Sequence, residues 1–154
     1  QYGHMFAPRP SIVVKELARV LKPGGILAFS TWPKELFMGK FFKLIESFSQ
    51  PLPPEVASPV LWGDMAIIED RLKDHFDHIE FARDTMFAPT MSPAHMLKLF
   101  EKNAGPLANL VKALADDPTK LSNLRNAALV LIEKFFSNNF LRQDFLMTRC
   151  VKKT

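Results

Sequence analysis

The sequence contains very little cysteine and little glycine, and both shortages narrow what the protein can be. Of its 154 residues one is a cysteine and six are glycines. Cys150 alone cannot form an internal disulfide, so a reducing, cytoplasmic compartment is expected. Cys150 lies in an apolar run, where a buried structural thiol is more common than a reactive one. No two glycines form a Gly-x-Gly pair, so the glycine-rich turn that holds a nucleotide cofactor is absent.

Long apolar runs are missing as well. A membrane-spanning helix needs about 18 to 20 consecutive apolar residues, and no stretch reaches that length, so no membrane span is expected. The first ten residues, QYGHMFAPRP, lack the basic leader and the apolar stretch of a secretory signal. The chain does not begin with methionine, which suggests that it belongs to something longer.

The excess of one sign of charge over the other is also small. The net charge is +4, and the lysines and arginines are scattered among acidic residues. The one basic pair, Lys152-Lys153, lies at the C-terminus, where solvation is its simplest role. Nucleic acid is therefore not an expected partner.

Two further kinds of site lack their residue patterns. His75, His78 and His95 have neither the mutual spacing nor the cysteine neighbours of a metal site, so no metal is expected. None of the serines lies in a Gly-x-Ser-x-Gly context, which argues against a hydrolase.

The pattern that is present alternates helices with apolar strands. An apolar fraction of 47% and a charged fraction of 23% are typical of one ordinary globular domain with a core of its own. Periodicity and capping residues predict a series of elements in this order: a helix from Ser11, a strand Ile26–Thr31, a helix over 34–49, a proline-rich loop over 50–61, a helix capped by Asp64, a strand Ile79–Phe87, a helix from Ser92 that Gly105 closes, a helix over 106–115, a helix from Asp117 to about Phe136, and a strand Asp144–Val151.

The joint between the first helix and the first strand is the most informative stretch. It reads ELARVLKPGGILAFSTW from Glu16 to Trp32: the end of an amphipathic helix, a Pro-Gly-Gly stop and an apolar strand. So apolar a strand is expected to be buried on both faces, as in a parallel α/β sheet. A helix followed by such a strand is half of a βαβ unit, whose opening strand would lie before residue 1. The helix over 34–49 is expected to pack on this sheet.

The segment LKPGGILAFSTW resembles the class I S-adenosylmethionine-dependent methyltransferases, most closely small-molecule enzymes of the ubiquinone/menaquinone-biosynthesis type. In that family a helix ending in LKPGG leads into the fifth strand of a seven-stranded sheet. The opening YGHMFAPRP is similar to the segment after the family's fourth strand. The stretches Ile79–Phe87 and Asp144–Val151 would be the sixth and seventh strands.

The resemblance implies a fold. The chain would be an α/β protein, the C-terminal half of a Rossmann-like seven-stranded methyltransferase sheet. Its last strand would insert antiparallel between the fifth and sixth, forming a reversed C-terminal β-hairpin. Residues 1–154 would form a single partial domain, with sheet and flanking helices in 1–90 and 139–154 and a helical insertion in 91–138. The insertion would either cover the active site or serve as a structural bundle.

The resemblance also implies a cofactor, S-adenosylmethionine, which the family's first half binds. No residue of this chain is predicted to bind it, because the glycine-rich turn is absent. Gly24-Gly25 follows a helix and precedes a strand, the wrong order for holding an anion at a helix N-terminus.

Candidate site residues follow from the rule that ligands of open α/β sheets lie beyond the carboxyl ends of the strands. His4 is the candidate base or hydrogen-bond partner of the substrate; the alternative is a structural histidine. Five further residues are candidates for lining the substrate pocket, with ordinary core or loop packing as their alternative: Tyr2, Met5, Phe6, Trp32 and Trp62.

Three functions remain open at this point. In the first, the intact parent protein methylates a small, largely apolar molecule, and this chain, without the cofactor half, is inactive alone. In the second, the chain is a non-catalytic, self-associating module, a homo-oligomer formed through the exposed sheet edge at Ile26–Thr31. In the third, the helical insertion binds an apolar ligand.

Overall fold

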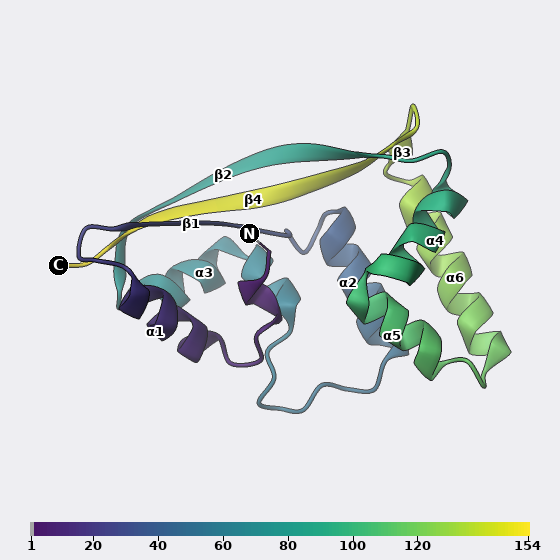
Figure 1. The fold of residues 1–154 in the computed structure, drawn as a ribbon, viewed down its shortest axis with the longest axis horizontal. Helices are drawn as coiled ribbons and strands as arrows, with labels where there is room; N and C mark the ends of the chain where they lie inside the picture. The colour runs from purple at the N-terminus through teal and green to yellow at the C-terminus, as the bar shows by residue number, and fades with distance from the viewer. Residues whose placement is uncertain (1) are drawn as a thin grey trace. The chain divides into compact units, whose positions relative to one another are not determined.

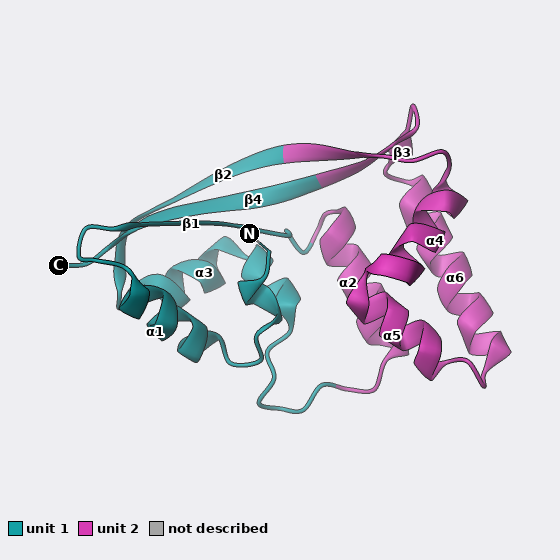
Figure 2. Ribbon diagram, viewed as in Figure 1, with its two compact units in different colours: residues 1–34, 52–84, 144–154 teal, residues 35–51, 85–143 magenta. Residues whose placement is uncertain are grey.

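The computed structural model describes residues 2–154 and shows a mixed α/β protein, with six α-helices and a four-stranded sheet in those residues (Figure 1). The chain divides into two compact units (Figure 2). Unit 1 comprises residues 1–34, 52–84 and 144–154, and unit 2 comprises residues 35–51 and 85–143. The boundary between the units falls within two long strands.

Unit 1 contains the joint between helix and strand that the sequence emphasises. Its elements are the 3-10 helix η1 (His4–Phe6), α1 (Pro10–Val20), β1 (Ile26–Thr31), the 3-10 helix η2 (Pro59–Gly63), α3 (Met65–Leu72), and the larger parts of β2 (Phe76–Pro89) and β4 (Phe140–Lys152). The predicted bounds of β1 are confirmed. β2 and β4 are each longer than predicted and extend into unit 2.

The sheet has the strand order β1-β4-β2, so the last strand of the chain lies between the other two (Figure 1). β4 runs antiparallel to β1, in a register that pairs Ile26 with Val151 and Thr31 with Leu146. β3 (Phe136–Ser137) is a short strand that also pairs antiparallel with β4. β1 is an end strand of the described sheet.

One face of the β1–β4 ladder forms the core of unit 1. Successive strand residues point to opposite faces. The buried face carries Phe29 of β1, and on β4 it carries Leu146 opposite Thr31 and Cys150 opposite Leu27. α1, α3, η1 and η2 lie on this side (Figure 1). On the other face Ile26 is 55% exposed. Ala28 on that face is also exposed, whereas Ser30 is 0% exposed, so in the described residues the expectation that β1 is buried on both faces holds only at the C-terminal end of the strand.

α1 shows the same one-sided burial. Apolar residues at i, i+4, i+7 and i+8 predict a stripe of Val13, Leu17, Val20 and Leu21 on this helix, yet the residues that α1 buries are Val14 and Ala18. Val20 is 64% exposed. The predicted stripe therefore lies next to the buried face and leaves apolar side chains without a covering element in the described residues.

Unit 2 is a helical cluster. It consists of α2 (Phe37–Phe48), α4 (Pro93–Asn103), α5 (Gly105–Ala113) and α6 (Pro118–Glu133) with the adjoining strand ends. Within unit 2, α2 packs against α5 and α6. Its centre is an aromatic cluster in which Phe37 and Phe41 stack and both lie near Phe100.

Local sequence signals explain where these helices begin. The Ser92 hydroxyl accepts the N–H of His95 at 3.1 Å, and the Asp117 carboxylate accepts the N–H of Lys120 at 2.9 Å, so both predicted N-caps are confirmed. The prediction for Gly105 is wrong. It is the first residue of α5, while Ala104 caps the end of α4. The two helices meet with one residue between them, too short a joint for sequence periodicity to locate.

The β3–β4 hairpin turns on Asn138 and Asn139, whose φ angles are +49° and +62°. Positive φ at both central residues defines a type I′ turn, which matches the twist of the two strands. In residues 2–154 no helix has the length and apolar character needed to cross a membrane.

Candidate functional site

The segment before α1 lies along the outer edge of β1. The Tyr2 N–H donates to the Ser30 carbonyl at 3.3 Å. The Tyr2 ring stacks on the Trp32 ring, with centroids 4.1 Å apart and planes 1° from parallel. Burial raises the pKa of the Tyr2 phenol, and a hydrogen bond with the Ser30 side chain opposes that rise. Tyr2 and Trp32 are thus brought together at the carboxyl end of β1.

His4 forms a second aromatic contact beside the first. Its ring centroid lies 4.5 Å from that of Phe29 and 4.6 Å from that of Trp62, edge-on in both cases. The His4 Nε2 is buried and has no hydrogen-bond partner among the described residues. The pKa of His4 is lowered to about 4, mainly by burial, with a smaller contribution from the charge of Arg71. His4 is therefore neutral at pH 7 and weakly basic, which favours hydrogen bonding over proton abstraction.

Trp62 is buried and in contact with a charged side chain. It is 1% exposed, and its indole N–H has no partner in residues 2–154. The guanidinium of Arg71, on α3, lies over the Trp62 ring at 4.5 Å from its centroid, a cation–π contact. Burial lowers the pKa of Arg71.

Gly63 brings the two tryptophan segments into contact. A Cβ added at Gly63 would lie 1.9 Å from the Trp32 carbonyl oxygen and 2.8 Å from the Cα of Pro33. The backbones of 32–33 and 63 therefore touch directly, which no side chain would permit. Glycine is required here for close packing and not for a turn.

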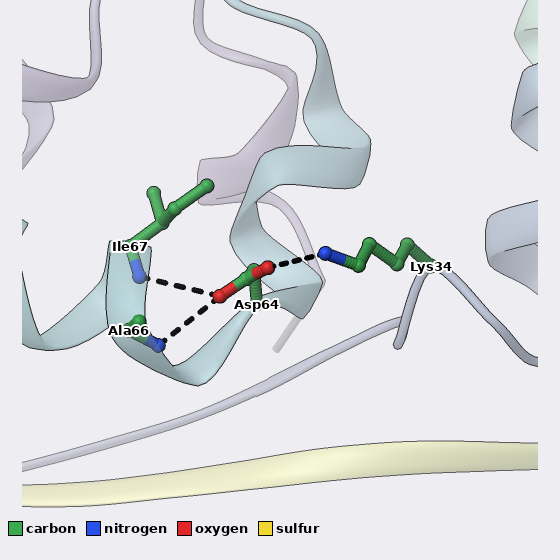
Figure 3. Close-up of polar contacts among 4 residues, drawn as sticks. All are labelled: Lys34, Asp64, Ala66 and Ile67. Atoms are coloured by element: carbon green, nitrogen blue, oxygen red, sulfur yellow. Dashed lines mark hydrogen bonds and ion pairs between the residues drawn. The ribbon is translucent and has the colours of Figure 1, made fainter.

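A polar contact secures the same junction. The Asp64 carboxylate caps α3 by accepting the N–H of Ala66 at 3.1 Å and that of Ile67 at 3.5 Å (Figure 3). Its other oxygen accepts from Lys34 Nζ at 2.5 Å. The Lys34 hydrogen bond is the main reason that the pKa of Asp64 is lowered. Lys34 thereby joins the end of the β1 segment to the start of α3.

The six candidate residues all lie in unit 1, in different surroundings. Tyr2 pairs with Trp32, and His4 pairs with Trp62. Met5 is 1% exposed and belongs to the core, while Phe6 is 49% exposed and faces outward. Their roles toward a substrate remain predictions.

The sequence analysis missed Phe29 and Arg71. Phe29 sits in the middle of β1 and gave no signal beyond its apolar character. Arg71 gave a weak sequence signal, because it lies on α3 between Ile68 and Leu72, which are both 0% exposed. An arginine beside the buried stripe of a short helix is uncommon and invites a search for its partner.

The glycines do not form a cofactor cradle in the described residues. Gly24 has φ +74° and, with Gly25, forms the turn between α1 and β1. Gly63 is filled by the backbone of Trp32, and Gly105 begins α5. None of these four glycines forms the turn from a strand into a helix that the cofactor motif of the resembled family uses.

Comparison with known proteins gives distant relatives. The uncharacterized protein Rv1403c of Mycobacterium tuberculosis (strain ATCC 25618 / H37Rv) is 27% identical over 146 residues, which cover 94% of this chain and 53% of that protein. The uncharacterized protein Rv1405c of the same strain is 24% identical over 152 residues, covering 98% of this chain and 56% of that protein. The chain spans about half the length of the curated relatives it matches. No protein-family model matches the chain.

Proposed function

We propose that this chain is the substrate-side, C-terminal half of a class I S-adenosylmethionine-dependent methyltransferase whose intact form methylates a small, largely apolar molecule. The sheet would be part of a Rossmann-like seven-stranded sheet, with β1, β2 and β4 as its fifth, sixth and seventh strands. The chain alone would be inactive, and the cytoplasm would be its compartment.

The observation that carries the proposal is the strand order. The resemblance implies a last strand inserted antiparallel between the fifth and the sixth, and β4 lies between β1 and β2 and runs antiparallel to β1. A chain that simply added each new strand at the sheet edge would end with β4 outside β2. Insertion of the final strand is therefore a specific feature, and it supports the family more than the LKPGG sequence does.

The outer edge of β1 supports the proposal from another direction. Ladder bonds alternate along a strand, and the Ser30 carbonyl accepts from Tyr2. The N–H and C=O of Ile26 and Ala28 therefore point to the same outer edge, away from β4. A strand running upstream from Tyr2 would continue along that edge, as the fourth strand of the proposed sheet does.

Activity of the longer protein tests this function. We expect transfer of a labelled methyl group from S-adenosylmethionine to some member of a panel of small apolar acceptors by the full-length protein, and no transfer by the 154-residue chain. Transfer by the isolated chain would contradict the proposal.

A second function, self-association as a non-catalytic module, has its own supporting observation. The end strand β1 is short and uncharged, and the groove on α1 is lined by Ile12, Val13, Leu17 and Val20 together with one charged residue, Glu16, so its lining is mostly apolar. Open edges and apolar patches of this kind favour pairing with another chain. Binding of an apolar ligand by the helical insertion has no such observation and stays a prediction.

Ala28→Pro tests the second function. It removes an N–H that points to the open edge and leaves the ladder to β4 intact. If the chain is a dimer or larger assembly in light scattering, Ala28→Pro should shift it toward the monomer. A clean wild-type monomer would count against self-association.

A further inference from the structure

Three side chains of unit 1 each bury a nitrogen that has no hydrogen-bond partner in residues 2–154. They are His4 Nε2, Trp62 Nε1 and Arg71 Nη1. The His4 ring lies 4.6 Å from the Trp62 ring, and the Arg71 guanidinium lies 4.5 Å from the same ring. Buried polar groups are almost always hydrogen-bonded. Each of these three nitrogens, on the Trp62 indole or on a side chain in contact with it, therefore lacks a partner that a bound group could supply.

Arg71 sets the charge of that partner. Its guanidinium stays protonated in proteins, and no carboxylate among the described residues forms an ion pair with it. A partly buried cation without a counter-ion loses solvation without gaining an ion pair, so an anion at this point would stabilise the fold.

The donor set defines the chemistry more closely. An indole N–H and a guanidinium only donate, and His4 Nε2 donates in one of its two neutral tautomers. The buried hydroxyl of Thr148 also lacks a partner, and Thr148 pairs across the ladder with Phe29, which His4 contacts. Donors around a positive charge match an oxyanion. An apolar ligand would leave the same nitrogens unpaired, and the described residues contain no group suited to a metal ion.

We propose that His4, Trp62 and Arg71 form an oxyanion-binding site, in which the Arg71 guanidinium and the Trp62 indole N–H hold a carboxylate or phosphate group. His4 and Arg71 are only partly buried, so the site reaches the surface. The inference rests on the proposed function only in making the oxyanion a substituent of the methyl acceptor. Binding itself does not depend on methyl transfer.

The indole N–H signals of the chain in nuclear magnetic resonance test the site. There are two tryptophans, and Trp32→Phe identifies the signal of Trp62. Titration with benzoate or inorganic phosphate should move the Trp62 signal saturably and leave that of Trp32 nearly fixed. Stronger binding of benzoate would indicate a carboxylate ligand, and stronger binding of phosphate a phosphorylated one. The absence of saturation with both, or an equal shift with sodium chloride at matched ionic strength, overturns the proposal.

Variants of Arg71 add specificity. Arg71→Met keeps much of the side-chain volume and should weaken binding of the anion at least tenfold. Arg71→Lys keeps the charge but not the paired N–H donors of the guanidinium, so its affinity should lie between those of wild type and Arg71→Met. Arg19→Met, at an exposed arginine on α1 that pairs with Glu16, is the matched control and should bind like wild type. Equal weakening by Arg19→Met would mean that bulk charge binds the anion, which overturns the site. If Arg71→Met does not fold, Arg71→Lys and the wild-type titration decide. Because the readout is binding, a failed methyl-transfer assay leaves this test intact.

Discussion

At the scale of single residues, the stability of unit 1 depends on close contacts that a single added methyl group or proton would disturb. Gly63 is the tightest, because the Trp32 carbonyl occupies the position of its missing Cβ. His4 is the most perturbed titratable group, since burial lowers its pKa to about 4. Both lie at the junction that holds Trp32 and Trp62 together.

Gly63→Ala should destabilise unit 1 by about 3 kcal/mol or more, because backbone rather than a flexible side chain must move. Both tryptophans belong to unit 1, so tryptophan fluorescence during urea unfolding reports on it. Gly105→Ala is the matched control: nothing lies within 4 Å of its added Cβ, and alanine suits a helix. A Gly63→Ala variant as stable as Gly105→Ala would show that the close approach is wrong.

His4 should make stability fall as the pH drops. Its pKa in the folded chain is about 4 against 6.5 ordinarily, so the unfolded chain binds the proton more readily between those values. The free energy of unfolding is therefore unaffected by His4 above about pH 6.5, falls between pH 6.5 and pH 4, and does not fall further through this group below pH 4. The loss amounts to about 2 to 3 kcal/mol.

Urea unfolding at several pH values measures this loss. His4→Gln should remove most of the decline, and His78→Gln, at an exposed histidine on β2, should retain it. A decline unchanged in His4→Gln would assign it to other groups.

At the scale of elements, turns and caps follow from local chemistry. The β3–β4 hairpin needs positive φ at Asn138 and Asn139, and asparagine tolerates that region better than most residues. The Asn139 carbonyl also accepts the Thr90 N–H at 2.9 Å, which ties the turn to the end of β2.

Asn139→Gly should therefore stabilise the hairpin by about 0.5 kcal/mol, and Asn139→Ala should destabilise it by about 1 kcal/mol. Thermal unfolding followed by circular dichroism should rank the three proteins Gly, Asn, Ala in falling stability. An alanine variant as stable as the glycine variant would contradict the type I′ turn.

The same elements show what the sequence could predict. The β1 bounds, the caps at Asp64, Ser92 and Asp117 and the general order of elements follow from local patterns. The partners of α2 and the buried side of α1 do not, because periodicity identifies an apolar face without saying which element covers it. Among site residues, strand-end reasoning selected His4, and Trp62 was a candidate because a tryptophan can line an apolar pocket. Strand-end reasoning could not find Arg71, whose role depends on a contact between separate elements.

At the scale of the whole molecule, the described residues leave several apolar surfaces open. β1 is an end strand of the described sheet, Ile26 and Ala28 on one of its faces are exposed, and the groove on α1 is mostly apolar. These surfaces all surround the strand that the proposal makes the fifth of seven. The relatives are about twice as long as their matched part, so a protein of that length has room for the remaining strands.

Calorimetric titration of S-adenosylmethionine tests the central claim most directly. It should be run in parallel on this chain and on the full-length relative Rv1403c. We expect saturable, micromolar binding by the longer protein and no measurable binding by this chain, whose sequence lacks a glycine-rich turn. Micromolar binding by this chain alone, or none by the full-length relative, would contradict it.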